Sequence, residues 1–169
     1  MNIFKDLYTA TLSLKRNDYL KVAGSVDTNI YFIESGSLRI YILDEDEEQI
    51  IRFGYSDNII VALDSFFTEK PSDFYIQAIK KTVVNVIPKN VFYGFIEKSA
   101  SHKSLLIPLL EDLILQQMER EKDILTASPK ERFNRVMRRS PRLFQEIPDK
   151  YIANYLRMSP ETLSRLKKS

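Results

Sequence analysis

The sequence has no cysteine and a single histidine, His102. Without thiols, the chain cannot form disulfides, hold zinc or an iron–sulfur cluster through thiolates, or use a cysteine nucleophile. One histidine cannot supply the cluster of histidines and carboxylates that metal-dependent β-barrel enzymes need. A lone histidine near a helix start is more typical of a surface residue than of a haem ligand. We therefore expect no enzyme activity, no metal and no cofactor.

Glycine and long apolar runs are also scarce. The four glycines are dispersed, which argues against a glycine-rich phosphate loop and a nucleophile elbow. No apolar run approaches the roughly 18 residues of a membrane span, and the N-terminus lacks the basic start and apolar stretch of a signal peptide. We expect a cytoplasmic protein with no membrane partner.

Positive charge is concentrated near the C-terminus. Residues 128–169 contain 11 Lys and Arg but 4 Asp and Glu, a net charge of +7, whereas residues 1–127 carry a net charge of −5. A chance cluster of solvated charge is the plain alternative. A reversal of this size at one point favours an acidic body with a basic segment that binds a polyanion.

Residues 21–88 have the pattern of a β-barrel or jelly roll. Short runs rich in Ile, Val, Tyr and Phe alternate with turn signals such as Ser35-Gly36-Ser37 and the acidic stretch 44–48. In the run SLRIYIL, every second position is apolar, which predicts a strand with one buried face. A few helical residues are expected at 2–8. The predicted fold class is α+β, with a sensor-like barrel domain over residues 1–100.

After Pro88 the hydrophobic period becomes helical, with a short helix over 89–99 and a longer one over Ser101–Thr126. Pro108 either lies in the first turn of the long helix or kinks it. A coiled-coil seam is predicted at Leu106, Leu110, Leu113, Gln117, Arg120 and Ile124. A second stripe comprises Ile107, Ile114, Met118 and Leu125. The segment 101–127 is therefore predicted to be a dimerisation helix with Leu106, Leu110, Leu113, Gln117 and Ile124 at the interface, or else a helix that buries one wide stripe in a single core.

The last segment, 128–169, is predicted to be a helical domain. Ser128-Pro129 suits the start of a helix that continues to about Arg139. A second helix is expected over Asp149–Leu156, followed by a tight turn and a terminal helix that Ser159 caps. Ile152, Ala153, Leu156, Leu163 and Leu166 would pack the two helices together. This layout is that of a helix-turn-helix, whose second helix enters the DNA major groove.

The polar residues of the terminal helix have the chemistry for DNA. An arginine can donate two hydrogen bonds to guanine, and a glutamate can accept one from cytosine, which favours Arg165 and Glu161 as base-reading residues. Hydroxyls and lysines suit phosphates. A simple surface pair between Glu161 and Arg165 is the alternative. The candidate DNA-binding residues are Tyr151, Ser159, Glu161, Thr162, Ser164, Arg165, Lys167 and Lys168.

The segments ESGSLRIY and IPDKYIANYLRMSPETLSRLKK, with the long helix between them, resemble the cyclic-AMP receptor protein/Fnr family of bacterial transcription regulators, in particular short members typical of Bacteroidetes. The resemblance covers nearly the whole chain. It implies a cyclic-nucleotide-binding-type barrel, a dimerisation helix and a helix-turn-helix on an inverted-repeat operator. RNA polymerase and an unknown small-molecule effector are further candidate partners.

Three positions depart from that family pattern. Arg157 stands where the family turn usually has Gly, and a positive φ there would cost about 1 kcal/mol. Pro160 replaces an arginine that contacts bases in some members, so a different operator is expected. The sequence ends at Ser169, before the family's wing hairpin, so we expect a smaller contribution from phosphate contacts.

The family's nucleotide-binding residues are also replaced. The glutamate that binds the ribose corresponds to Val61, and the Arg-Ser pair that holds the phosphate corresponds to Ser72-Asp73. A carboxylate repels a phosphate, so cyclic AMP is not expected as the effector. Gln117 either contacts an effector or sets helix register, and we favour register. The candidate effector-pocket residues are Val61, Ser72, Asp73 and Gln117.

The leading hypothesis is a homodimeric, sequence-specific transcription regulator with a degenerate sensor barrel. The alternative is a dimeric small-ligand-binding or protein-interaction module without specific DNA binding.

Overall fold

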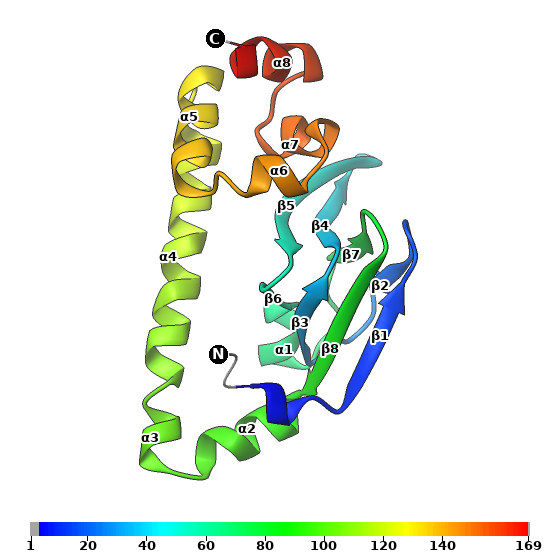
Figure 1. The fold of residues 1–169 in the computed structure, drawn as a ribbon, viewed down its shortest axis with the longest axis vertical. Helices are drawn as coiled ribbons and strands as arrows, with labels where there is room; N and C mark the ends of the chain where they lie inside the picture. The colour runs from blue at the N-terminus through cyan, green and yellow to red at the C-terminus, as the bar shows by residue number, and fades with distance from the viewer. Residues whose placement is uncertain (1–3, 169) are drawn as a thin grey trace. The chain divides into compact units, whose positions relative to one another are not determined.

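A computed structural model describes residues 4–168 (Figure 1). The chain divides into two compact units that meet between Lys103 and Ser104, three residues beyond the expected barrel boundary. The N-terminal unit contains both β-sheets, and the C-terminal unit is helical. The long helix therefore belongs to the same unit as the C-terminal helices.

The N-terminal unit is built from two four-stranded antiparallel sheets, ordered β1-β8-β3-β6 and β2-β7-β4-β5. Their inward faces share one core, formed by Tyr31, Ile33, Leu38, Ile40, Ile60, Ala62, Ile76, Ala78, Val84 and Val86. The jelly-roll-like pair of sheets and the C-terminal helices confirm the α+β class. The strands are β1 Ala10–Leu14, β2 Tyr19–Lys21, β3 Asn29–Ser35, β4 Ser37–Asp44, β5 Glu47–Tyr55, β6 Ile59–Val61, β7 Tyr75–Ala78 and β8 Thr82–Pro88.

Strand β1 corrects the expectation that the sheets begin at Lys21. Four of its five residues are exposed, because it is an edge strand that pairs only with β8. An edge strand with exposed side chains has no need of alternating apolar residues, so its sequence carries no strand pattern. The hydroxyl of Thr11 contributes a side-chain bond across the pair, donating to Asn85 Oδ1 at 2.7 Å.

Strand β4 is buried on both faces, although one buried face was expected. Arg39 donates to Gln77 Oε1 and forms an ion pair with Glu48, which satisfies its guanidinium in a buried position. Tyr41 stacks on Tyr75, with ring centroids 5.0 Å apart. Polar and aromatic residues can be buried when they are paired in this way, so the alternation indicated the strand correctly but not the exposure of its second face.

Gly36 allows the chain to pass from β3 in one sheet to β4 in the other. Its φ is +93°, a conformation that residues with a Cβ rarely adopt. A Cβ on Gly36 would lie 2.4 Å from the carbonyl oxygen of Lys81 and 2.4 Å from Thr82 Oγ1. The position therefore needs glycine for its backbone angle and for the closeness of β8.

We expect Gly36→Ala to lower the free energy of unfolding by about 2 kcal/mol, because backbone strain is added to a steric overlap. Gly24→Ala is the matched control, since Gly24 also has a positive φ but no atom lies within 4 Å of the point that a Cβ would occupy. Urea denaturation of both variants separates the two contributions. Equal losses of unfolding free energy in the two variants would contradict this. They would show that the steric overlap at Gly36 is relieved by a small shift of β8 at no cost in free energy.

The helices follow the expected order, but one predicted helix is interrupted and two short helices, at Leu63–Thr68 and Leu143–Glu146, were not expected. The predicted helix over 101–126 is interrupted at Ser104-Leu105, and Pro108 is the third residue of the longer piece, where its missing N–H costs nothing. The helices of the N-terminal unit are the 3-10 turn Lys5–Leu7, α1 Leu63–Thr68, α2 Lys89–Glu97 and α3 Ala100–Lys103. Those of the C-terminal unit are α4 Leu106–Leu125, α5 Pro129–Arg139, α6 Leu143–Glu146, α7 Asp149–Tyr155 and α8 Pro160–Lys168.

A side-chain cap marks the start of α5. Ser128 Oγ accepts a hydrogen bond from the Glu131 amide at 3.3 Å, and Pro129 is the first residue of α5, as expected. The helix expected at 2–8 is reduced to one 3-10 turn, and Asn2 and Ile3 lie outside the described residues.

None of the helices between residues 4 and 168 combines the length and hydropathy that a bilayer crossing requires.

Candidate nucleic-acid interface and effector cavity

Helices α7 and α8 are joined by a tight turn, as predicted. Ser159 Oγ accepts a hydrogen bond from the Thr162 amide at 3.2 Å, so this residue caps α8. Ile152, Ala153 and Leu163 are buried, which places the two helices in close contact through small and apolar side chains. The same packing turns the other face of α8 toward solvent.

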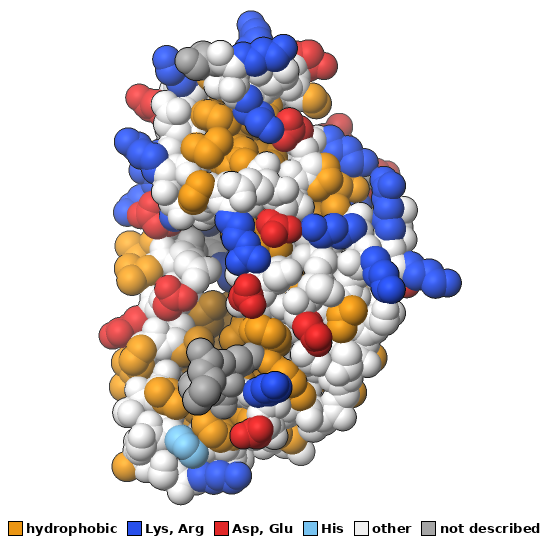
Figure 2. Space-filling view, viewed as in Figure 1, with side chains coloured by type: hydrophobic (Ala, Val, Ile, Leu, Met, Phe, Trp, Pro, Cys, Tyr) orange, Lys and Arg blue, Asp and Glu red, His pale blue; other side chains and the backbone are white. Residues whose placement is uncertain are grey.

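The exposed face of α8 carries the candidate DNA-binding side chains. Figure 2 shows Lys and Arg side chains gathered around this helix. Thr162 and Tyr151 are half-buried, and Tyr151 lies on α7, with the Lys150 ammonium 4.6 Å from its ring centroid. The remaining candidates are exposed: Ser159, Glu161, Ser164, Arg165, Lys167 and Lys168.

Contacts within the C-terminal unit distinguish these residues from one another. Lys167 Nζ lies 2.8 Å from Asp149 Oδ1, so its charge is partly offset by α7. Arg165 donates a weak bond to Thr162 Oγ1 at 3.4 Å, in place of the surface pair with Glu161 that was the alternative. The pKa of Glu161 is lowered by hydrogen bonds from its own amide and from the Ser159 hydroxyl, so it stays ionised near neutral pH.

The turn before α8 contains Arg157 in a left-handed conformation, with φ at +52°. This is the position where the family pattern has glycine, and the strain expected there is therefore present. The carbonyl oxygen of Arg157 is held by Arg132 of α5, whose Nη2 donates to it at 2.9 Å.

Arg132 connects the turn to the segment between α4 and α5. Its Nε donates to the Leu156 carbonyl at 2.8 Å, and its Nη1 donates to the carbonyls of Thr126 and Ala127 at 2.6 and 2.9 Å. One guanidinium thus bonds four carbonyl oxygens from two separate segments. Arg132 carried no signal in the sequence, because its most distant partners are 24 and 25 residues away.

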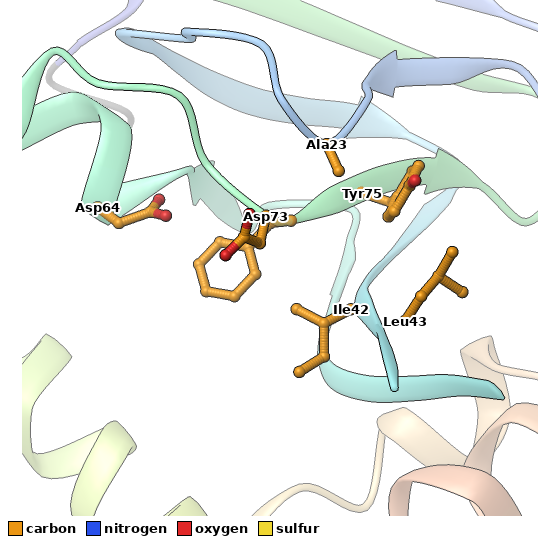
Figure 3. Close-up of a pocket in the computed structure, with 7 residues that line it drawn as sticks. Ala23, Ile42, Leu43, Asp64, Asp73 and Tyr75 are labelled. Carbon is orange, nitrogen blue, oxygen red and sulfur yellow. The ribbon is translucent and has the colours of Figure 1, made fainter. Parts of the chain in front are cut away.

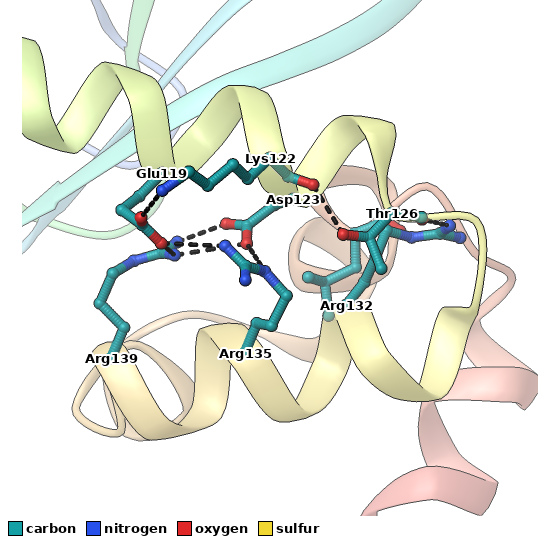
Figure 4. A network of polar contacts seen from close by, with 8 residues as sticks. Glu119, Lys122, Asp123, Thr126, Arg132, Arg135 and Arg139 are labelled. Atoms are coloured by element: carbon teal, nitrogen blue, oxygen red, sulfur yellow. Dashed lines mark hydrogen bonds and ion pairs between the residues drawn. The ribbon is translucent and has the colours of Figure 1, made fainter.

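A second group of charges joins α4 to α5 (Figure 4). Asp123 is fully buried, and its carboxylate accepts from Arg135 Nε at 3.0 Å and from the Arg139 guanidinium. Glu119 pairs with the same two arginines at 2.9 and 3.5 Å. Burial alone would lower the pKa of Arg139, but its bond and charge interaction with Asp123 raise that pKa above its ordinary value. These residues hold α5 in a fixed position against α4.

One position of the predicted dimer seam on α4 is buried within the C-terminal unit. Arg120, one of the seam positions, is only 7% exposed and lies over the Tyr155 ring, with Cζ 3.7 Å from the centroid. Leu106, Leu110 and Leu113 are half-buried, while Gln117 and Ile124 are exposed. The most exposed apolar side chains of α4, with exposures from 47% to 79%, are Leu115 and the four residues of the second stripe, Ile107, Ile114, Met118 and Leu125.

A cavity of about 450 Å³ that opens to solvent lies on the N-terminal unit (Figure 3). This volume is in the range of small-ligand sites. Asp73 is part of the lining, whereas Val61 and Ser72, which the sequence grouped with it, lie outside it. Val61 pairs with Ile30 in the sheet, and buried Ser72 accepts from the Phe74 amide at 3.2 Å. The lining residues are Ala23, Ile42, Leu43, Asp64, Asp73, Phe74 and Tyr75.

A buried lysine lies close to this cavity. Lys21 is 4% exposed, and its Nζ donates to the carbonyl oxygens of Val22, Ser72 and Phe74 at 3.0, 3.3 and 3.1 Å. Burial lowers the pKa of Lys21, and the charges of nearby carboxylates, Asp64 first among them, act in the opposite direction. Gln117, the fourth candidate pocket residue, is on α4 in the other unit.

Residues 11–99 match the family model of the cyclic nucleotide-binding domain, and no curated protein matches the sequence. The chain is similar to the structure of FixK2 from Bradyrhizobium japonicum, with 16% identity, a TM-score of 0.76, and coverage of 94% of this chain and 82% of that one. It is also similar to the structure of a CooA mutant from Carboxydothermus hydrogenoformans, with 14% identity and a TM-score of 0.72. That match covers 94% of this chain and 74% of the CooA chain. A third similar structure is a protein from Eubacterium rectale assigned to the crp/fnr family of transcriptional regulators. It has 21% identity and a TM-score of 0.67, and the match covers 99% of this chain and 85% of that one. At these identities the likeness establishes a shared fold.

Proposed function

Because the chain belongs to the cyclic nucleotide-binding domain family, we propose that it is a transcription regulator that binds DNA as a homodimer and carries an altered effector cavity. The shared fold with structures of crp/fnr-type regulators supports this assignment. The single observation that carries it is the exposed polar face of α8, which a buried Leu163 and a capping Ser159 hold in place.

The residues of α8 have distinct roles in this proposal. Arg165 and Glu161 contact base edges, because both are exposed and neither is committed to an ion pair with the other. Thr162, Ser164 and Lys168 contact phosphates, which position the helix in the groove. Lys167 contributes less than expected from the sequence, since it is paired with Asp149. Two copies of α8 would lie roughly 34 Å apart and read an inverted repeat.

Selection of binding sites from random DNA tests this function. We expect an inverted repeat to be enriched. Arg165→Ala should weaken binding to that repeat by about 1–3 kcal/mol and relax the preference at one base pair per half-site. Lys168→Ala is the control, because loss of a phosphate contact should weaken all sequences alike and reduce the salt dependence. If the unmodified chain enriches no repeat, the interaction-module alternative replaces the proposal.

The second stripe of α4 is the proposed dimer contact. Its residues Ile107, Ile114, Met118 and Leu125 are spaced 7, 4 and 7 apart, which suits a parallel two-helix seam. Large apolar side chains that are exposed in one chain would be covered by the same stripe of a second copy. The half-buried Leu106, Leu110 and Leu113 are weaker candidates, because less of their apolar surface is exposed.

We expect the double variant Ile114→Glu and Met118→Glu to be monomeric, because association would bury four unpaired carboxylates. Light scattering of the purified protein measures this directly. Gln116→Lys, which adds a charge on the opposite face of α4 beside Asp112, should leave the dimer intact. If the double variant stays dimeric, the second stripe is not the interface, and the face with Leu110 and Leu113 becomes the candidate.

A further inference from the structure

The cavity of the N-terminal unit is lined by negative charge. Its polar side chains are the Tyr75 hydroxyl and two carboxylates, Asp64 near the start of α1 and Asp73 just before β7. Figure 3 shows these carboxylates on one side, with Ile42 and Leu43 on the other. Phe74 and the ring of Tyr75 complete an apolar and aromatic lining. A ligand that fits must therefore combine an apolar body with a group that carboxylates attract.

The nearby lysine does not reverse this negative charge. The ammonium of Lys21 is directed to three main-chain carbonyls and is buried, so it is held by the protein and not presented to a ligand. Asp27, Asp64 and Asp73 all act electrostatically on Lys21. Three carboxylates around one ammonium leave an excess of negative charge beside the cavity.

The two cavity carboxylates have capacity left for a ligand. Asp64 uses Oδ1 to accept from the Ser65 amide at 2.8 Å, so its other oxygen can face the cavity. Asp64 and Asp73 are both exposed, which leaves them accessible to a molecule that enters from solvent. Asp27, by contrast, is buried and committed to the Tyr31 hydroxyl and the Asn29 amide.

A metal ion does not suit this site. No group of three or more His, Asp and Glu side chains among residues 4–168 is arranged to hold one. An ammonium group needs fewer ligands than a metal, because it donates hydrogen bonds in place of filling a coordination shell. An aromatic ring beside the carboxylates adds a favourable surface for an organic cation.

We propose that the cavity lined by Asp64, Asp73, Phe74 and Tyr75 binds an organic cation: a primary ammonium group on a small aromatic body. The ammonium donates to the two carboxylates, and the aromatic body contacts Ile42, Leu43 and Phe74. Binding of the amine depends on the cavity alone. The inference rests on the proposed function only where the amine is taken to be an effector that regulates DNA binding.

Titration calorimetry with the full chain tests the ligand class. We expect phenethylamine and tyramine to bind with dissociation constants of about 1 mM or tighter, and 3-phenylpropionate, which has a similar size and the opposite charge, not to bind. Cyclic AMP should also fail to bind. Binding of 3-phenylpropionate or cyclic AMP as tight as that of the amines would overturn the proposal, as would the absence of binding by both amines.

Variants locate the binding in the cavity. Asp64→Asn and Asp73→Asn keep the side-chain shape and should each weaken amine binding by about fivefold or more, since each removes one charge at close range. Asp6→Asn removes an exposed carboxylate from the N-terminal 3-10 turn and should change nothing. Amine binding that is unchanged in the double variant Asp64→Asn and Asp73→Asn would place the ligand elsewhere and refute the inference.

A parallel DNA-binding measurement separates this inference from the proposed function. Amine binding that depends on both aspartates, in a chain that selects no operator, would support the cavity assignment and refute the regulator. Operator binding in a chain that binds no amine would support the regulator and refute the cavity assignment.

Discussion

Asp123→Asn should lower the free energy of unfolding of the C-terminal unit by about 3–5 kcal/mol, the cost of breaking a buried ion pair on one side. The carboxylate of Asp123 is fully buried, and the guanidinium groups of Arg135 and Arg139 both point to it. Asparagine has the same shape but offers one acceptor oxygen and no charge. The two arginines would then remain close together without their shared partner.

Glu119→Gln is the matched control for that prediction. Glu119 contacts the same two arginines, but its side chain is 36% exposed, so water can replace it. Its loss should have only a small effect on unfolding, because exposed ion pairs are screened by solvent. Urea denaturation followed by the helical circular dichroism signal measures both variants. A similarly small loss of unfolding free energy in both variants would contradict this prediction. It would mean that water reaches Asp123 and that apolar packing alone holds α5 against α4.

Arg132→Ala should destabilise the C-terminal unit by about 3 kcal/mol, because one charged donor bonds four carbonyl oxygens and its loss leaves them to water or to nothing. Two of these carbonyls belong to the turn before α8, at Leu156 and Arg157. The same variant should therefore also weaken operator binding, since the turn that orients α8 loses its support. Thermal unfolding and DNA titration of one preparation measure the two effects.

Two further variants distinguish positioning from general stability in this experiment. Arg132→Lys keeps the charge but has a single nitrogen, which cannot reach both segments at once, so it should recover less than about half of the loss. Arg138→Ala removes an exposed arginine of the same helix and should be nearly neutral for stability. Full recovery by lysine would show that charge, and not the planar fork of the guanidinium, is what this position requires.

Much of the fold follows from local pattern. Runs of β-branched and aromatic residues between turn signals predicted β3, β4, β5, β7 and β8. The start of α5, the turn before α8 and its cap at Ser159 followed from Ser and Pro at helix starts. The strand β1 was missed because an exposed edge strand needs no alternation, and α6 was missed because four residues are too few to show a period.

The candidate sites were predicted less completely, because their decisive contacts are distant in the sequence. The exposed polar face of α8 was anticipated. The pairing of Lys167 with Asp149, across 18 residues, was not, and it reduces the charge that this lysine offers to DNA. Asp64, the second carboxylate of the cavity, carried no signal of its own in the sequence.

The sequence by itself determined that the chain has no thiol chemistry, where the strand period changes to a helical one, and which helix carries an exposed polar face. These properties depend on residue type and on neighbours within one or two turns of chain. Only the tertiary structure decided that Lys21 is buried among carbonyls, that Arg120 packs on Tyr155, and that Arg132 bonds two segments at once. Those contacts join residues that are distant in the sequence. Several residues of the same type could make each contact, and only the folded chain brings one of them to the partner.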